Sequence, residues 1–115
     1  MKGYTDIEQS KKLAEILPIE SADMFYRENG IDAKLMWEHN AHKVKYPCWS
    51  LAALLNVLPD TITSNDGIAF KLNIKKNIIE YSNPSLYLIY KSVKSDNIVD
   101  ACYEMIEKLH EQNLL

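Results

Sequence analysis

The chain has 115 residues and a formal net charge of −3, which fits one small acidic domain. Hydrophobic residues make up 47% and charged residues 25%, and this globular composition excludes a wholly disordered chain. The longest strongly apolar run, residues 51–55, is too short to span a bilayer, which takes about 20 residues. No apolar stretch follows Lys2, so we expect no secretion signal, a cytoplasmic location and two reduced cysteines.

The first predicted element is a helix over residues 5–17. Thr5 and Glu8 have the spacing of a capping box, in which the two residues satisfy each other's free backbone N–H groups. Apolar residues follow at near-helical spacing up to Leu17. Pro18 ends the helix, because a proline disfavours helical geometry in the residue before it.

A β-hairpin is predicted next, over residues 23–28 and 31–38. Asn29 and Gly30 lie between two apolar runs, and this dipeptide favours the positive φ angles of a tight hairpin turn. The sequence leaves open whether this hairpin joins the main sheet.

A second helix is predicted over residues 47–58. Pro47 suits the first helical position, where its missing N–H leaves no hydrogen bond unmade. The segment is apolar nearly all round and carries no charge, so we expect it at the centre of the core. Pro59 ends the helix, and residues 60–67 are expected to form a polar loop.

Three strands are expected next, at residues 68–74, 78–81 and 86–93. Apolar and polar residues alternate along the first of them, as in a half-buried strand. Turn residues around Asn77 and Asn83 separate the three. Short turns between consecutive strands predict an antiparallel meander.

The last predicted element is a helix over residues 96–112, capped by Ser95, Asp96 or Asn97. Its apolar stripe consists of Ile98, Ala101, Cys102, Met105 and Leu109. The elements together predict one α+β domain over residues 1–115, in the order α-β-β-α-β-β-β-α. We expect two layers, with the hairpin and meander in an antiparallel sheet and about three helices mainly on one face.

Three stretches carry a family resemblance. They are the Pro-Cys-Trp-Ser-Leu run from Pro47 with the Leu-Pro at Leu58, the short segment at Ala22, and the Asp-Ala-Cys-Tyr-Glu-Met run from Asp100 followed by Leu-His-Glu at Leu109. In these stretches the chain resembles small uncharacterised proteins of gut Bacteroidota, often associated with prophages or other mobile elements. The resemblance implies a bacterial, cytoplasmic accessory protein. It implies no activity, because no function is established for those proteins.

Cys48 is the one candidate for catalytic chemistry. A thiol at a helix N-terminus can be held as the nucleophilic thiolate, and a Cys-Trp pair opening an apolar helix is similar to the nucleophile helix of papain-like hydrolases. Those enzymes also need a histidine later in the chain, and here only His110 follows, near the end of an acidic helix. A buried structural thiol is the favoured interpretation, and we expect no enzyme activity.

His39 and His42 are the residues that suggest a metal site. Together with Cys48 they offer three possible zinc ligands, but the fourth would have to be Cys102, which belongs to an apolar stripe. A solvated loop is therefore the favoured interpretation, and we expect no metal and no cofactor. The three glycines lie too far apart for a phosphate-binding loop.

Charge is distributed unevenly along the chain. Residues 67–94 carry five lysines against one glutamate, a net charge of +4. Residues 95–115 carry five acidic residues against one lysine, a net charge of −4, and residues 1–66 contribute −3. The small total thus combines opposing blocks, a basic meander and an acidic last helix.

If helices cover one face of the sheet, the other face is expected to be basic and to expose tyrosines. Such a face is typical of protein interfaces, and single-stranded nucleic acid also stacks on such faces. A solvated face with lysines protecting its edges would have the same composition. The expected binding residues are Lys71, Lys75, Lys76, Tyr81, Tyr87, Tyr90 and Lys91.

The leading hypothesis is therefore a small non-enzymatic interaction protein of a bacterium or its mobile element. It would bind a protein partner, or a second copy of itself to form a homodimer, through the basic tyrosine-rich face, with no membrane partner. The alternative is a nucleic-acid-binding module that uses the same meander. A thiol-dependent enzyme at Cys48 is the third hypothesis.

Overall fold

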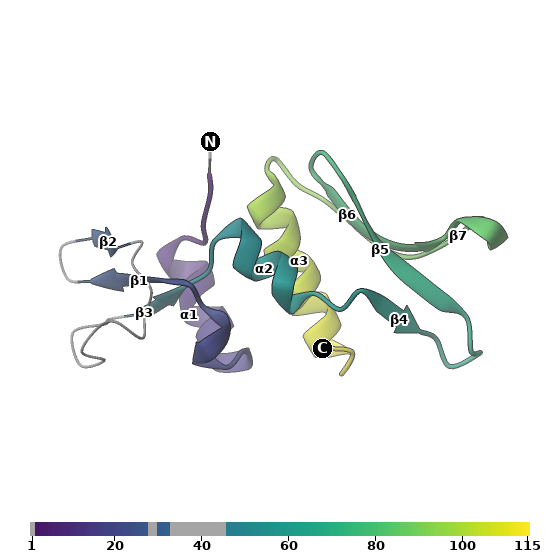
Figure 1. Cartoon of the computed structure of the whole chain (residues 1–115), viewed down its shortest axis with the longest axis horizontal. Coiled ribbons are helices and arrows are strands. Elements are labelled where there is room, and N and C mark those ends of the chain that lie inside the picture. Colours follow the sequence, from purple (N-terminus) through teal and green to yellow (C-terminus); the bar gives the residue numbers. More distant parts are fainter. Residues whose placement is uncertain (1, 28–29, 33–45) are drawn as a thin grey trace. The chain divides into compact units, whose positions relative to one another are not determined.

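The computed structural model of the chain describes residues 2–27, 30–32 and 46–115 and divides it into two compact units, Met1–Val57 and Leu58–Leu115. Each unit contains its own antiparallel sheet (Figure 1). The α+β class and the order of elements predicted from the sequence are confirmed, with two further short strands. The predicted hairpin and the meander lie in separate sheets, so the hairpin does not join the main sheet. The single domain over residues 1–115 stays a prediction.

The elements of the first unit are α1 Ile7–Ile16, the 3-10 turn η1 Ile19–Ser21, β1 Met24–Arg27, β2 Gly30–Asp32, β3 Tyr46–Cys48 and α2 Leu51–Val57. Its sheet has the strand order β2-β1-β3. Arg27 pairs with Gly30 in the antiparallel ladder of β1 and β2, so the predicted hairpin is confirmed as far as Asp32. Residues 33–38 of the prediction lie outside the described residues.

Helix α1 begins with a capping box one residue later than predicted. Asp6 accepts a hydrogen bond from the Gln9 N–H at 2.8 Å, and the Gln9 side chain accepts one from the Asp6 N–H at 3.1 Å. The predicted pair of Thr5 and Glu8 is wrong. Thr5 is fully buried, and its hydroxyl lies 2.8 Å from that of Ser10, so it serves the interior of the unit instead of the helix end.

Helix α2 begins at Leu51, so the prediction that it starts at Pro47 is wrong. Pro47 lies in β3, at one edge of the three-stranded sheet, where a strand tolerates a residue without an N–H. Ser50 provides the cap instead, because its hydroxyl accepts a hydrogen bond from the Ala53 N–H at 3.2 Å. Within α2, Ala53 and Leu54 are the buried residues, so the helix is less buried than predicted.

The elements of the second unit are β4 Thr61–Thr63, β5 Ala69–Lys75, β6 Ile78–Asn83, the 3-10 turn η4 Pro84–Leu86, β7 Leu88–Lys94 and α3 Ile98–Glu111. The sheet has the order β4-β5-β6-β7, with every neighbouring pair antiparallel, which confirms the meander. Strand β4 lies in the segment predicted as a polar loop. Its three residues are too few to show alternation in the sequence, although Ile62 is buried and pairs with Phe70.

Strand β7 begins at Leu88, two residues later than predicted. Pro84 opens a 3-10 turn, and the Asn83 side chain accepts a hydrogen bond from the Leu86 N–H at 3.2 Å. Tyr87 follows with φ 54° and ψ 38°, in the left-handed region that strands do not use. The chain therefore turns at Tyr87 before it enters the sheet.

Helix α3 supplies much of the core of the second unit. Asn97 caps it, because its side-chain oxygen accepts a hydrogen bond from the Asp100 N–H at 2.9 Å. The helix packs against β6 and β7 (Figure 1). Four residues of the predicted stripe are fully buried, Ala101, Cys102, Met105 and Leu109, whereas Ile98 is half-buried. Val99 and Ile106 beside the stripe are fully buried as well.

Candidate interaction surface

The register of β5, β6 and β7 assigns their side chains to two faces of the sheet. Ile79 and Tyr81 of β6 lie on the face that packs against α3, which we call the α3 face. Glu80 and Ser82 lie on the opposite face, directly across from Asn73 and Lys71 of β5. We call this second face the lysine face.

Tyr81 is not exposed, and this part of the sequence prediction is wrong. Its side chain is fully buried, and its hydroxyl donates a hydrogen bond to the Pro59 carbonyl at 2.7 Å. Burial, with smaller contributions from Asp60 and Cys102, raises the pKa of Tyr81 above its ordinary value. Tyr81 is therefore a hydrogen-bonded core residue, which sequence alternation in such a short strand did not distinguish from a surface tyrosine.

The lysine face carries spaced cations. Lys71 pairs with Ser82, and both Lys75 and Lys94 pair with Ile78 from its two sides. The amine of Lys75 lies 3.3 Å from the buried carboxylate of Glu80, which neutralises one of these charges.

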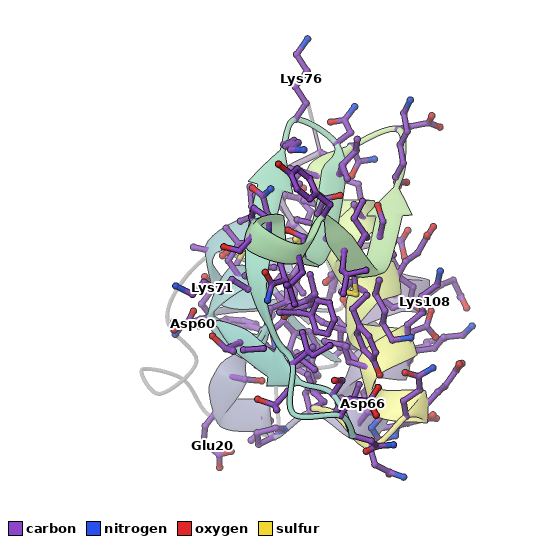
Figure 2. All side chains as sticks on the ribbon, turned by 90° about the vertical axis from the view of Figure 1, so that its right-hand side faces the viewer. Glu20, Asp60, Asp66, Lys71, Lys76 and Lys108 are labelled. Atoms are coloured by element: carbon purple, nitrogen blue, oxygen red, sulfur yellow. The ribbon has the colours of Figure 1, made fainter. Side chains whose placement is uncertain are left out.

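Lys76 lies apart from this row. It occupies the turn between β5 and β6 with φ 35°, and Figure 2 shows its side chain pointing away from the ribbon, far from Lys71. The lysines predicted as binding residues thus do not form one compact patch.

Tyr90 and Lys91 lie on the α3 face, away from the lysine face. The Tyr90 ring stacks on Phe70 with centroids 5.0 Å apart, and the Lys91 amine lies 5.3 Å from the centre of the Tyr90 ring. Tyr81 pairs with Lys91 and Ser82 pairs with Ile89, so Tyr90 is an extra, unpaired residue of β7. This bulge allows the consecutive residues Tyr90 and Lys91 to lie on the same face. Among the described residues of these strands, Tyr90 and Lys91 therefore lie together on one face, whereas Lys71, Lys75 and Lys94 lie on the other.

An exposed apolar segment, which we call the apolar segment 86–90, is a surface feature that the sequence predicts only in part. The relative exposure is 52% for Leu86, 95% for Tyr87, 42% for Leu88, 63% for Ile89 and 38% for Tyr90. The sequence signal was present, because five large apolar residues follow one another directly after a proline turn. The sequence predicts a strand over residues 86–93 here, with Tyr87 and Tyr90 on its surface, but not Leu86, Leu88 or Ile89.

The apolar segment runs into an edge strand. Strand β7 is the last in the order β4-β5-β6-β7 and has seven residues, whereas β4 at the other edge has three. Alternate N–H and C=O groups of an edge strand point away from the sheet, where a further strand can pair with them. The described part of the second unit therefore combines exposed apolar side chains with a long sheet edge.

Cys48 does not lie at a helix N-terminus. It belongs to β3 and is fully buried, with its sulfur 3.6 Å from the Thr5 hydroxyl and 3.4 Å from the Thr5 carbonyl oxygen. Burial raises the pKa of the Cys48 thiol, and the hydrogen bonds of Thr5 and Ser10 oppose this only in part. The geometry thus favours the protonated thiol, which is a poor nucleophile.

The remaining candidates give no further site within the described ranges. His39 and His42 lie outside them, and no group of three or more His, Cys, Asp or Glu residues within them could hold a metal ion. No helix within them is long and apolar enough to cross a membrane.

The chain was compared with protein-family models, with curated proteins and with solved structures, and none of them matches it.

Proposed function

We propose that this chain is a small non-enzymatic interaction protein that binds another protein, or a second copy of itself, through β7 and the apolar segment 86–90. The observation that carries the proposal is the run of five consecutive large apolar side chains, all between 38% and 95% exposed, at the start of an edge strand. The resemblance in the Cys-Trp-Ser-Leu stretch adds an accessory role in the bacterial cytoplasm, encoded by the bacterium or a mobile element.

The physical argument rests on the free energy of covering these side chains. Fully burying one large apolar side chain contributes about 1.5–3 kcal/mol, so a partner that covers several gains enough to offset part of the cost of association. A contiguous exposed apolar patch beside polar surroundings is typical of an interaction site. The neighbouring Lys91 and Lys94 supply the polar border.

Site-specific photo-crosslinking tests the proposal. A photoreactive residue replaces Tyr87, whose side chain is 95% exposed and so has few contacts within the fold to lose. On irradiation in a bacterial extract we expect a covalent adduct with a second polypeptide, and its mass separates a partner from a second copy. Adding Ile89→Glu should abolish the adduct, because the carboxylate would be buried at the contact.

A matched control is available on the same sheet. Ile74 is also an exposed strand isoleucine, at 45% against 63% for Ile89, but it lies in β5. Ile74→Glu should leave the adduct unchanged. An adduct that forms equally with both glutamate variants, or no adduct in the parent protein, would refute the proposed surface.

A further inference from the structure

We infer that β7 binds an extended acidic segment of another protein as an added antiparallel strand, with the segment's carboxylates beside Lys91 and Lys94 and its apolar side chains beside Leu88 and Ile89. The inference rests on the proposed function and specifies the chemistry of the partner. Three observations support it. The two edges of the sheet differ in length, the first half of β7 is apolar, and its second half carries two lysines.

The two edges of the sheet differ in their ability to accept a strand. Strand β4 spans three residues, and short edge strands are one means by which proteins prevent unwanted pairing. Strand β7 spans seven residues, long enough for a full partner strand. The edge that can accept a strand is therefore β7.

Strand β7 changes character along its length. Leu88 and Ile89 at its start are 42% and 63% exposed and carry no charge. Lys91 and Lys94 occupy its second half, after the irregularity that skips Tyr90. Lysines and irregularities protect an edge from indiscriminate pairing, so the first half is unprotected and the second half admits only a segment of suitable charge.

The charges of β7 disfavour a second copy of the same strand. In a symmetric antiparallel pair along the whole strand, residues 88–94, the central Lys91 of each copy would lie opposite the other. Like charges directly opposite one another destabilise a strand pair. Lys94 would lie opposite the apolar Leu88, which offers it no counter-charge. A second copy of β7 is thus a poor match for this edge.

An acidic segment avoids both unfavourable pairings, because it offers a counter-charge to each lysine. Two carboxylates three positions apart can lie opposite Lys91 and Lys94, and the residues that follow can cover Leu88 and Ile89. Opposite charges across neighbouring strands stabilise the pair and also select the register. Lys91 and Lys94 point to opposite faces of the sheet, so the partner's two carboxylates would do so as well.

Two synthetic peptides test the inference directly. The acidic probe is Glu-Thr-Thr-Glu-Val-Ile-Val, and the basic probe replaces both glutamates by lysine; each carries a fluorescent label and blocked ends. Fluorescence anisotropy with the full chain at low salt should show binding of the acidic peptide at least about tenfold tighter than of the basic one. Added salt should reduce this ratio, because it screens exposed charges.

Charge-reversal variants localise the effect. The double variant Lys91→Glu with Lys94→Glu should reverse the preference and bind the basic peptide more tightly. The double variant Lys71→Glu with Lys76→Glu makes the same change in net charge elsewhere on the sheet, and it should retain the original preference.

Several results would overturn the inference. They are binding of neither peptide, equal affinity for both, or a preference that the β7 variant retains and the matched control loses. A wild-type dimer in light scattering that excludes the acidic peptide would instead identify a second copy as the occupant. If Ile89→Glu abolishes the crosslink while the peptides show no charge preference, the proposed function stands and only the acidic partner strand is refuted.

Discussion

The hydroxyl of Thr5 is the centre of a buried polar cluster in the first unit. It lies 2.8 Å from the Ser10 hydroxyl, accepts a hydrogen bond from the Trp49 N–H at 3.2 Å and lies 3.6 Å from the Cys48 sulfur. The carbonyl of the same residue accepts from the Tyr26 hydroxyl at 2.6 Å. Thr5, which precedes α1, thus connects that helix to both β1 and β3.

Removing this hydroxyl should destabilise the protein. We expect Thr5→Val to lower the free energy of unfolding by about 1–3 kcal/mol, because it keeps the shape but leaves the buried Trp49 N–H unpaired. Denaturant titration measures the change. Thr5→Ser keeps the hydroxyl and is the control, and equal stability of the valine variant and the parent would contradict the prediction.

The second cysteine makes stability depend on pH. Burial raises the pKa of the Cys102 thiol from 9.0 to about 12. Above pH 9.0 the thiol ionises in the unfolded chain but stays protonated in the folded one, so unfolding releases a proton and stability falls as pH rises.

The size of this loss follows from the proton balance. Between about pH 8 and about pH 10, the free energy of unfolding of the parent should fall by about 1 kcal/mol more than that of Cys102→Ala. Denaturant titrations of both proteins across this range give the difference. Cys102→Ala leaves a small cavity, but that cost does not vary with pH. If the free energies of unfolding of the two proteins changed equally with pH, Cys102 would have the same pKa in the folded and the unfolded chain, and the prediction would be wrong.

At the scale of the elements, α3 depends on the residue that caps its start. Asn97 accepts a hydrogen bond from the Asp100 N–H at 2.9 Å, and its amide donates to the Asp100 carboxylate at 2.8 Å. Asn97→Ala should reduce the free energy of unfolding by about 0.5–2 kcal/mol, since it leaves helical N–H groups without an acceptor. Thermal unfolding followed by circular dichroism measures this, and Asn97→Ser, which keeps an uncharged acceptor at the cap, should recover most of the loss.

Elements with a long repeating pattern could be predicted from the sequence, and those fixed by distant contacts could not. Helix α3 has a full apolar stripe and a good cap, and it was predicted to within two residues at either end. The predicted start of α2 is wrong because Pro47 is equally suited to an edge strand. Its pairing with Phe25 of β1 decides between helix and strand, and the local sequence does not contain that contact.

The candidate surface was predicted only in part, for a similar reason. Its location in the meander followed from charge and aromatic content, and Tyr87, Tyr90 and Lys91 do lie at the end proposed to bind. Tyr81 was misplaced because its hydroxyl finds the Pro59 carbonyl, an acceptor 22 residues away in the sequence. The edge position of β7 depends on strand order, which local periodicity does not contain.

At the scale of the whole molecule, the division into two units makes a prediction about cooperativity. Residues 58–115 contain a four-stranded sheet, helix α3 and a set of fully buried apolar side chains. We expect this fragment alone to show strand and helix signals in circular dichroism and a cooperative thermal transition. An unfolded fragment would instead favour the single domain predicted from the sequence.

The positions of the tryptophans allow the unfolding of the two units to be followed separately. Both tryptophans of the chain, Trp37 and Trp49, belong to residues 1–57. Trp49 is fully buried, and its indole N–H donates a hydrogen bond to the Ser21 hydroxyl at 2.9 Å. Tryptophan emission therefore follows the first unit alone, whereas far-ultraviolet circular dichroism follows both. The wild-type chain thus carries an intrinsic optical label on one half, and comparing the two melting curves separates the halves without any added dye.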